Sequence, residues 1–131
     1  MQSIKVMKRR ILIVEDELGA RRLLEYLLGA YYQVTAVTNG KEAIHFLDEG
    51  NEVDLIITDI EMPIMTGLEM VSYMRDVPVY SEIPYILVTS KEKSTVMTAL
   101  GGQEVNYLNK PLQPKTLYWK VEEVLTRAVG F

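Results

Sequence analysis

The sequence predicts an α/β fold in which a doubly wound, five-stranded parallel sheet is covered on both faces by five helices. Two observations carry this prediction. Short apolar runs rich in β-branched residues recur along the chain, and amphipathic segments of helical length separate them. Strands that alternate with helices at this spacing form parallel sheets with right-handed crossovers. The length of 131 residues suits one domain with one core.

The strands are predicted from their apolar runs. Residues 11–14, 54–58 and 85–88 are almost continuously apolar, which is typical of strands that are buried on both faces. Residues 34–37 and 105–108 give a weaker form of the same signal. Together they supply the five strands of the sheet.

The helices are predicted from apolar residues at helical spacing. Thr66 is a plausible N-cap, and Pro114 suits the first turn of the last helix. In that last helix, Leu117, Val121, Val124 and Ala128 form the expected buried stripe. Pro78 and Pro84 are expected to shape a loop. The five predicted helices cover residues 17–28, 40–47, 66–75, 91–100 and 114–128.

Composition excludes several functional classes. The formal net charge of -4 argues against direct nucleic-acid binding through a basic face. The chain has no cysteine, so disulfides, thiolate catalysis and cysteine metal sites are excluded. No apolar run approaches the roughly 18 residues of a membrane helix, and the N-terminal residues do not resemble a signal peptide. We therefore expect a cytoplasmic protein that does not bind membranes.

Polar residues follow four of the five predicted strands. In such a sheet, binding sites lie beyond the carboxyl ends of the strands. Four strands therefore deliver acids, a hydroxyl and an amine to one edge. The residues are Glu15, Asp16 and Glu17 after the first strand, Asp59 and Glu61 after the third, Thr89 and Ser90 after the fourth, and Lys110 after the fifth.

This arrangement suits phosphoryl chemistry. Crowded carboxylates repel one another unless a cation compensates, and oxygen ligands suit Mg2+. A metal ion, a lysine and a hydroxyl together bind a phosphoryl group, and an aspartate can itself accept that group as an acyl phosphate. Each residue also has a simpler explanation, because Asp16 and Glu17 suit a helix start, Thr89 suits an N-cap, and Lys110 suits a solvent-exposed turn. Their joint position at one edge favours the phosphoryl site.

Four motifs in order resemble the receiver domain of bacterial two-component response regulators over about residues 9–128. They are residues 11–17, 57–69, 87–90 and 107–112, which read ILIVEDE, ITDIEMPIMTGLE, LVTS and YLNKPL. The resemblance implies a single receiver domain over 1–131. It also implies a flavodoxin-like fold with strand order 2-1-3-4-5.

The resemblance also implies a role for each matched residue. Asp59 would be the phosphoacceptor, and its donor a sensor histidine kinase or a phosphotransfer protein. Mg2+ would be bound by Asp16, by Asp59, by the backbone carbonyl of Glu61 and, largely through water, by Glu15.

Three further positions complete the resemblance. Lys110 would pair with the phosphoryl oxygens, and the Lys110–Pro111 bond would be cis. Thr89 and Tyr107 would form the conformational switch. The loop before Tyr107 departs from the family, which commonly has Gly-Ala-Asp-Asp where this chain has GGQEVN.

We expect the signal to pass to a partner through the surface formed by the helix over 91–100, the strand over 105–108 and the last helix, as in many receivers. Met97, Tyr107 and Trp119 would lie on this surface, and Trp119 falls about 200° around the helix from Leu117. A downstream protein or a second copy in a weak dimer would bind there.

Two alternative functions compete with a non-enzymatic switch. The first is an aspartyl-phosphate hydrolase of the haloacid dehalogenase type, whose second acid is only half matched by Glu61 and whose cap domain is missing. The second is a receiver-like scaffold that is not phosphorylated, which the loss of Asp59, Thr89 or Lys110 would have favoured.

Overall fold

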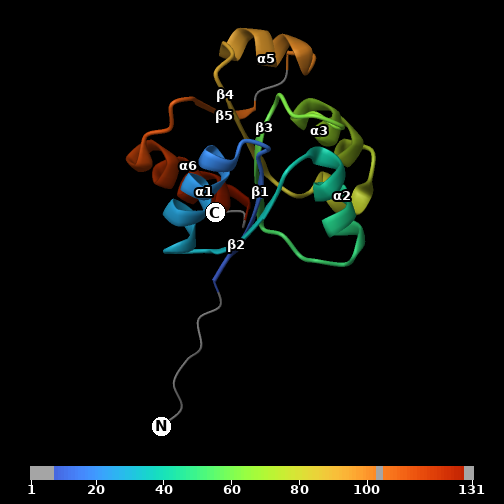
Figure 1. Ribbon diagram of the computed structural model, residues 1–131. Coiled ribbons are helices and arrows are strands. Elements are labelled where there is room, and N and C mark those ends of the chain that lie inside the picture. The colour runs from blue at the N-terminus through green and yellow to red at the C-terminus, as the bar shows by residue number, and fades with distance from the viewer. Residues whose placement is uncertain (1–7, 103–104, 129–131) are drawn as a thin grey trace.

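The computed structural model describes residues 8–102 and 105–128. Strands and helices alternate along the chain, apart from a short extra helix before the fourth strand (Figure 1). The strands are β1 (Arg10–Val14), β2 (Gln33–Val37), β3 (Leu55–Asp59), β4 (Tyr85–Thr89) and β5 (Asn106–Asn109). The helices are α1 (Leu18–Gly29), α2 (Gly40–Asp48), α3 (Gly67–Arg75), α4 (Pro78–Ser81), α5 (Lys93–Ala99) and α6 (Pro114–Ala128).

All four strand pairings are parallel, and the sheet has the order β2-β1-β3-β4-β5. The predicted fold class and strand order are therefore confirmed. Val14 lies opposite Thr58, and Thr89 lies opposite Asn109. This register brings the carboxyl ends of β1, β3, β4 and β5 to one edge of the sheet.

The core consists of two apolar layers, one on each face of the sheet. Alternate strand residues point to opposite faces, so Ile11 and Ile13 contribute to one layer and Leu12 and Val14 to the other. Helices α1 and α6 cover the first layer, and α2 and α3 cover the second (Figure 1). Val96 of α5 also contributes to the second layer. Burial on both faces explains why the central strands have no alternating polar pattern.

Side-chain caps fix the helix starts. Glu17 accepts hydrogen bonds from the N–H groups of Gly19 and Ala20 at the start of α1. Thr66 caps α3 as predicted, and it forms a capping box with Glu69 in which each side chain accepts the other's backbone N–H. These caps satisfy N–H groups that have no partner within the helix.

The described residues contain six helices, whereas the sequence predicts five. The additional helix is α4, a single turn where a loop was expected, and it begins with Pro78 in the first-turn position that proline favours. Tyr80 anchors this turn, because its ring packs against the second core layer and its hydroxyl donates to Asp48. A four-residue turn shows no helical periodicity, so the sequence pattern could not reveal it.

The last helix largely follows the predicted stripe. Leu117, Val121 and Val124 are buried, and Trp119 is 65% exposed on the opposite side. Ala128, in the final turn, is exposed, so the stripe ends one turn earlier than predicted. Among the described residues, none of the helices is long and apolar enough to cross a membrane.

Candidate functional site

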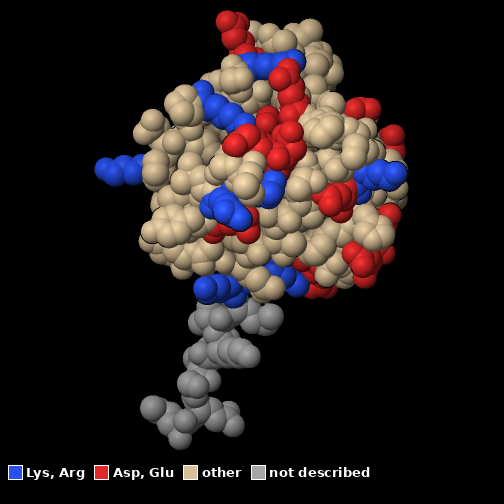
Figure 2. Space-filling view, in the orientation of Figure 1, with Lys and Arg blue, Asp and Glu red and all other residues tan. Residues whose placement is uncertain are grey.

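The carboxyl edge of the sheet carries a partly buried lysine–carboxylate cluster. Lys110 follows β5, and its Nζ lies 2.9 Å from Glu15 Oε1 and 2.9 Å from Asp59 Oδ2. The side chain of Glu15 is 2% exposed, that of Asp59 12% and that of Lys110 30%. Figure 2 shows acidic side chains gathered in the upper middle of the face shown, below α5, with basic side chains beside them. Four strands are predicted to deliver residues to this edge, and residues from three of them, β1, β3 and β5, are in contact in this cluster.

The cluster depends on the lysine for its charge balance. Burial raises the pKa of the Glu15 carboxyl, although the hydrogen bond from Lys110 partly opposes this effect. Burial by itself would lower the pKa of Lys110, but its hydrogen bonds to Glu15 and Asp59 outweigh that effect and raise it. Lys110 therefore stays protonated at neutral pH and compensates carboxylates that would otherwise repel each other.

Glu15, Asp16 and Asp59 also fit a divalent cation. Each offers a carboxylate oxygen, and the three oxygens lie within 4.8 Å of one another. Hard oxygen donors on a partly exposed rim are the ligands that Mg2+ takes in proteins. The Glu61 carboxylate is held by Lys91, whose Nζ lies 2.9 Å away, and it is not part of this group. The backbone carbonyl of Glu61 remains the predicted additional ligand.

Arg21 supports the acidic loop, although it is not among the site residues predicted from the sequence. From the first turns of α1, its guanidinium donates to the backbone carbonyls of Glu15 and Asp16, at 3.1 and 3.2 Å. These bonds fix the loop that carries both carboxylates. The signal available in the sequence was its place one turn after the N-cap Glu17, facing the preceding loop.

The loop after β3 is tightly built around Asp59. The backbone N–H of Ile60 donates to Asp59 Oδ1 at 2.6 Å and so orients the carboxylate. Gly67 begins α3, and its N–H donates to the Ile60 carbonyl at 2.9 Å. A Cβ on Gly67 would lie 2.1 Å from the Asp59 carbonyl oxygen. Ile64, at the tip of the loop, has a φ of 72°. Only glycine permits the close approach of α3 to the strand end.

Thr89 and Tyr107, the two predicted switch residues, meet at the backbone of Lys91. The N–H of Lys91 donates to Thr89 Oγ1 at 3.2 Å, and the Lys91 carbonyl accepts from the Tyr107 hydroxyl. Asn109 adds a third contact, because its Nδ2 lies 2.9 Å from the Tyr107 hydroxyl and 3.3 Å from the Lys91 carbonyl. The two predicted residues are thus linked through the backbone of one residue, Lys91.

Lys91 and Asn109 also contribute, although neither is among the site residues predicted from the sequence. Asn109 stands two residues after Tyr107 on β5, a spacing that places both on the same side of a strand, and this was the available signal. Lys91 acts through its backbone, which leaves no signature in the sequence. The Lys110–Pro111 bond is cis, as the resemblance implied.

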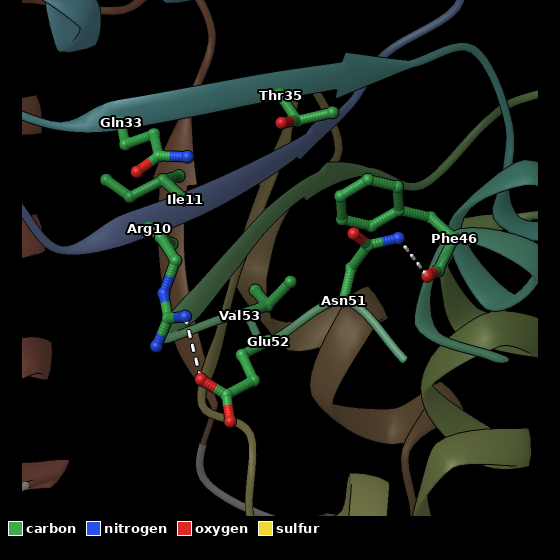
Figure 3. A pocket seen from close by; sticks show the side chains of 8 residues that line it. All are labelled: Arg10, Ile11, Gln33, Thr35, Phe46, Asn51, Glu52 and Val53. Carbon is green, nitrogen blue, oxygen red and sulfur yellow. Dashed lines mark hydrogen bonds and ion pairs between the residues drawn. The ribbon is translucent and has the colours of Figure 1, made fainter. Parts of the chain in front are cut away.

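A hollow of about 290 Å³ lies at the amino-terminal edge of the sheet, opposite the lysine–carboxylate cluster (Figure 3). Arg10 and Glu52 both line it, but they are paired with each other at 2.8 Å. Asn51 donates to the Phe46 carbonyl at 2.8 Å, and Arg10 also contacts Asp54 at 3.5 Å. Because these polar groups already satisfy one another, this hollow is the weaker candidate site.

The fold and the cluster define a doubly wound α/β protein whose site of acids and lysine lies at the carboxyl edge of the sheet. The sequence matches the profile of the response regulator receiver domain over residues 11–122, and the chain belongs to this family. Receiver domains are generally signalling switches of two-component systems and not metabolic enzymes.

Relatives and solved structures agree with this assignment. The chain is 36% identical to a chemotaxis protein CheY homologue of Campylobacter jejuni over 124 residues, which are 92% of this chain and 95% of the relative. It is 36% identical to the chemotaxis protein CheY1 of Helicobacter pylori over 119 residues, 88% of this chain and 96% of that protein.

Among solved structures, the receiver domain of a histidine kinase from Syntrophus aciditrophicus superposes with a TM-score of 0.81 at 32% identity, covering 91% of each chain. The chemotaxis response regulator CheY4 of Vibrio cholerae superposes with a TM-score of 0.79 at 28% identity, covering 91% of this chain and 99% of the other.

Proposed function

We propose that this chain is a phosphorylation-driven switch in which Asp59 accepts a phosphoryl group from a phosphohistidine. The donor is a sensor histidine kinase or a phosphotransfer protein. One observation carries the proposal: the Lys110 ammonium group lies 2.9 Å from both Asp59 and Glu15, beside a third carboxylate on Asp16. A protonated amine next to a nearly buried aspartate can stabilise charge that develops on a transferring phosphoryl group.

In the proposed transfer, a carboxylate oxygen of Asp59 bonds to phosphorus while the bond from phosphorus to the histidine nitrogen breaks. The imidazole leaves with the electron pair of that bond and takes up a proton. The Ile60 N–H holds the Asp59 carboxylate in place, and Lys110 compensates the negative charge of the phosphoryl oxygens. Asp16, Asp59 and the Glu61 carbonyl would hold Mg2+, with Glu15 acting largely through water, and the ion would supply further charge neutralisation.

We propose that the signal then passes through the backbone of Lys91. A phosphoryl group on Asp59 offers strong acceptors near the Thr89 hydroxyl, which at present accepts the Lys91 N–H. When Thr89 turns to donate to the phosphoryl group, the loop that carries Lys91 moves with it. Tyr107 follows, because its hydroxyl is bonded to the Lys91 carbonyl.

The surface that changes, and that a partner would recognise, is formed by α5, β5 and α6. Tyr107 lies there half-buried, and Trp119 presents a large exposed aromatic side chain. Exposed aromatic residues are frequent anchors of protein interfaces. We propose that a downstream protein, or a second copy in a weak dimer, binds this surface, and that the chain does not contact nucleic acid directly.

The proposal is tested by modifying Asp59. Acetyl phosphate with Mg2+ should add one phosphoryl group to the protein, and intact-mass measurement should detect it. Asp59→Asn should not be modified, because an amide is a poor nucleophile. Asp76→Asn, the same change at an exposed aspartate after α3, should react like the wild type.

Removal of Mg2+ by a chelator should also prevent the reaction. An acyl phosphate that still forms on Asp59→Asn would place the acceptor elsewhere. A wild-type protein that stays unmodified at millimolar Mg2+ would favour the unphosphorylated scaffold.

A further inference from the structure

A hollow of about 330 Å³ lies between α1, the start of β2 and α6, and it is lined by three tyrosines and one glutamate. Tyr31 and Tyr32 follow the end of α1, while Tyr118 and Glu122 lie on successive turns of α6. We call this the tyrosine hollow. None of these four residues belongs to the phosphoacceptor site, so the proposed phosphorylation does not explain them.

Two of the tyrosine rings form a right-angled corner. The ring centroids of Tyr31 and Tyr118 are 5.3 Å apart and their planes make an angle of 88°. When one ring stands on the face of another in this way, the space in the corner is bounded by the π face of each. The Tyr118 hydroxyl donates to the Leu27 carbonyl at 2.7 Å, which fixes that ring in place. Because π faces carry negative charge, such a corner attracts a cation.

A carboxylate reinforces this attraction. Glu122 accepts a hydrogen bond from the Tyr32 hydroxyl, which holds its charge at the wall of the tyrosine hollow. Among the described residues, the ion pairs of α6 go to the neighbouring Glu123, which contacts Lys120 and Arg127, and none goes to Glu122. Arg9 interacts electrostatically with Tyr32, but its Nε lies 4.0 Å from Asp54 and it does not line the hollow.

Tyr31 differs from the other two tyrosines because its exposed side chain is available for binding and is not needed for core packing. Tyr32 is buried in the first core layer and Tyr118 packs against that layer, so both contribute to stability. Tyr31 is 63% exposed and adds little to the core. Its ring nonetheless forms one wall of the corner, where it would contact a bound group.

We propose that the tyrosine hollow binds an organic cation, a guanidinium or alkylated ammonium group, between the faces of Tyr31 and Tyr118 and beside the Glu122 carboxylate. Such groups are weakly hydrated, so they lose little when they enter a hollow of aromatic faces. Site and ligand complement each other in charge and shape. The group is either a free small cation or the side chain of a basic residue on a partner protein.

The test is an NMR titration of the full chain with tetramethylammonium and with methylguanidinium, at constant ionic strength. We expect saturable shifts at residues 31, 32, 118 and 122, and no saturable shift with sodium alone. Tyr31→Leu and Glu122→Gln should each raise the apparent Kd at least about threefold, as expected for the loss of one exposed cation–π or ionic contact.

Matched controls lie on the neighbouring helix. Tyr26→Leu and Glu25→Gln make the same changes at exposed positions of α1 outside the hollow, and both should bind like the wild type. Linear, non-saturating shifts with both cations would overturn the proposal. So would equal weakening in the test and control variants.

The source of the cation is decided by comparison with a short blocked peptide that contains one arginine. If the peptide binds more tightly than methylguanidinium, the natural ligand is a partner's side chain, and if it binds more weakly, the ligand is a free cation. The test does not involve Asp59, so its result is independent of the proposed phosphorylation.

Discussion

Replacing Gly67 by alanine tests whether the close approach of α3 to the end of β3 sets the position of Asp59. In the native fold, a Cβ at Gly67 would lie 2.1 Å from the Asp59 carbonyl oxygen, and 3.1 Å from both the Asp59 carbonyl carbon and the Ile60 Cα. All three are backbone atoms, so no rotamer change can remove the clash. The helix start and the strand end would have to separate by roughly 1 Å to reach the 3.0 Å below which real Cβ contacts essentially never occur.

The expected loss of stability follows from this geometry. Overpacking in a well-packed region costs about 1–3 kcal/mol, and a clash with rigid backbone belongs at the upper end. The Gly67 N–H is also bonded to the Ile60 carbonyl at 2.9 Å, and a displacement would weaken that bond. We therefore expect Gly67→Ala to lower the free energy of unfolding by about 2–3 kcal/mol, a large share of the ~5–15 kcal/mol of a typical domain.

Urea unfolding monitored by tyrosine and tryptophan fluorescence measures this loss. With a typical m-value of about 1–3 kcal/mol/M, the midpoint should fall by about 0.7–3 M. Gly29→Ala is the matched control, because it makes the same change at the last residue of α1, where a Cβ meets no atom within 4 Å. That variant should be unchanged or up to about 1 kcal/mol more stable, since alanine favours helices.

The same variant reports on the site. Because the clashing oxygen belongs to Asp59 itself, Gly67→Ala should also bind beryllofluoride with Mg2+ more weakly than Gly29→Ala does. A Gly67→Ala midpoint equal to that of the wild type would refute the reasoning, since the close approach would then be relieved without cost.

Three further outcomes are expected. Lys110→Met should lower the free energy of unfolding at pH 7 by about 1–3 kcal/mol without Mg2+, because Glu15 and Asp59 lose their common partner. The loss should be smaller with Mg2+ present, and equal losses in both conditions would contradict this. Asn109→Leu should loosen the Tyr107 ring, which would keep only its hydrogen bond to the Lys91 carbonyl. We expect an effect of about 0.5–1.5 kcal/mol on the ring's conformational equilibrium and a shift of its NMR signals, and unchanged signals would contradict this. Trp119→Ala should leave the free energy of unfolding within about 0.5 kcal/mol of the wild type but weaken binding of the partner or dimer, and a cooperative loss of folding would show that the residue is structural.

Much of the site could be predicted from the sequence. Parallel strands that are buried on both faces appear as apolar runs, and the residues after them must meet at one edge. The sequence therefore predicts that Glu15, Asp59 and Lys110 lie close together, and the structure confirms that they meet. Thr66 was recognised as a cap for a similar local reason, because N-capping depends on residues within one turn. Whether Asp59 is phosphorylated stays a prediction.

The sequence by itself thus determined the order of the elements, the class of the sheet and the identity of the charged groups at its edge, because each follows from short-range periodicity. Only the tertiary structure decided how those groups are supported. Arg21 and Lys91 act on or through backbone atoms, so residue type does not reveal their contacts. Tyr118 reaches the Leu27 carbonyl across 91 residues of sequence, and the tyrosine hollow exists because α1 and α6 pack on the same face of the sheet. Periodicity shows which face of a helix is buried, but the distance between two side chains depends on how the helices pack against the sheet and each other.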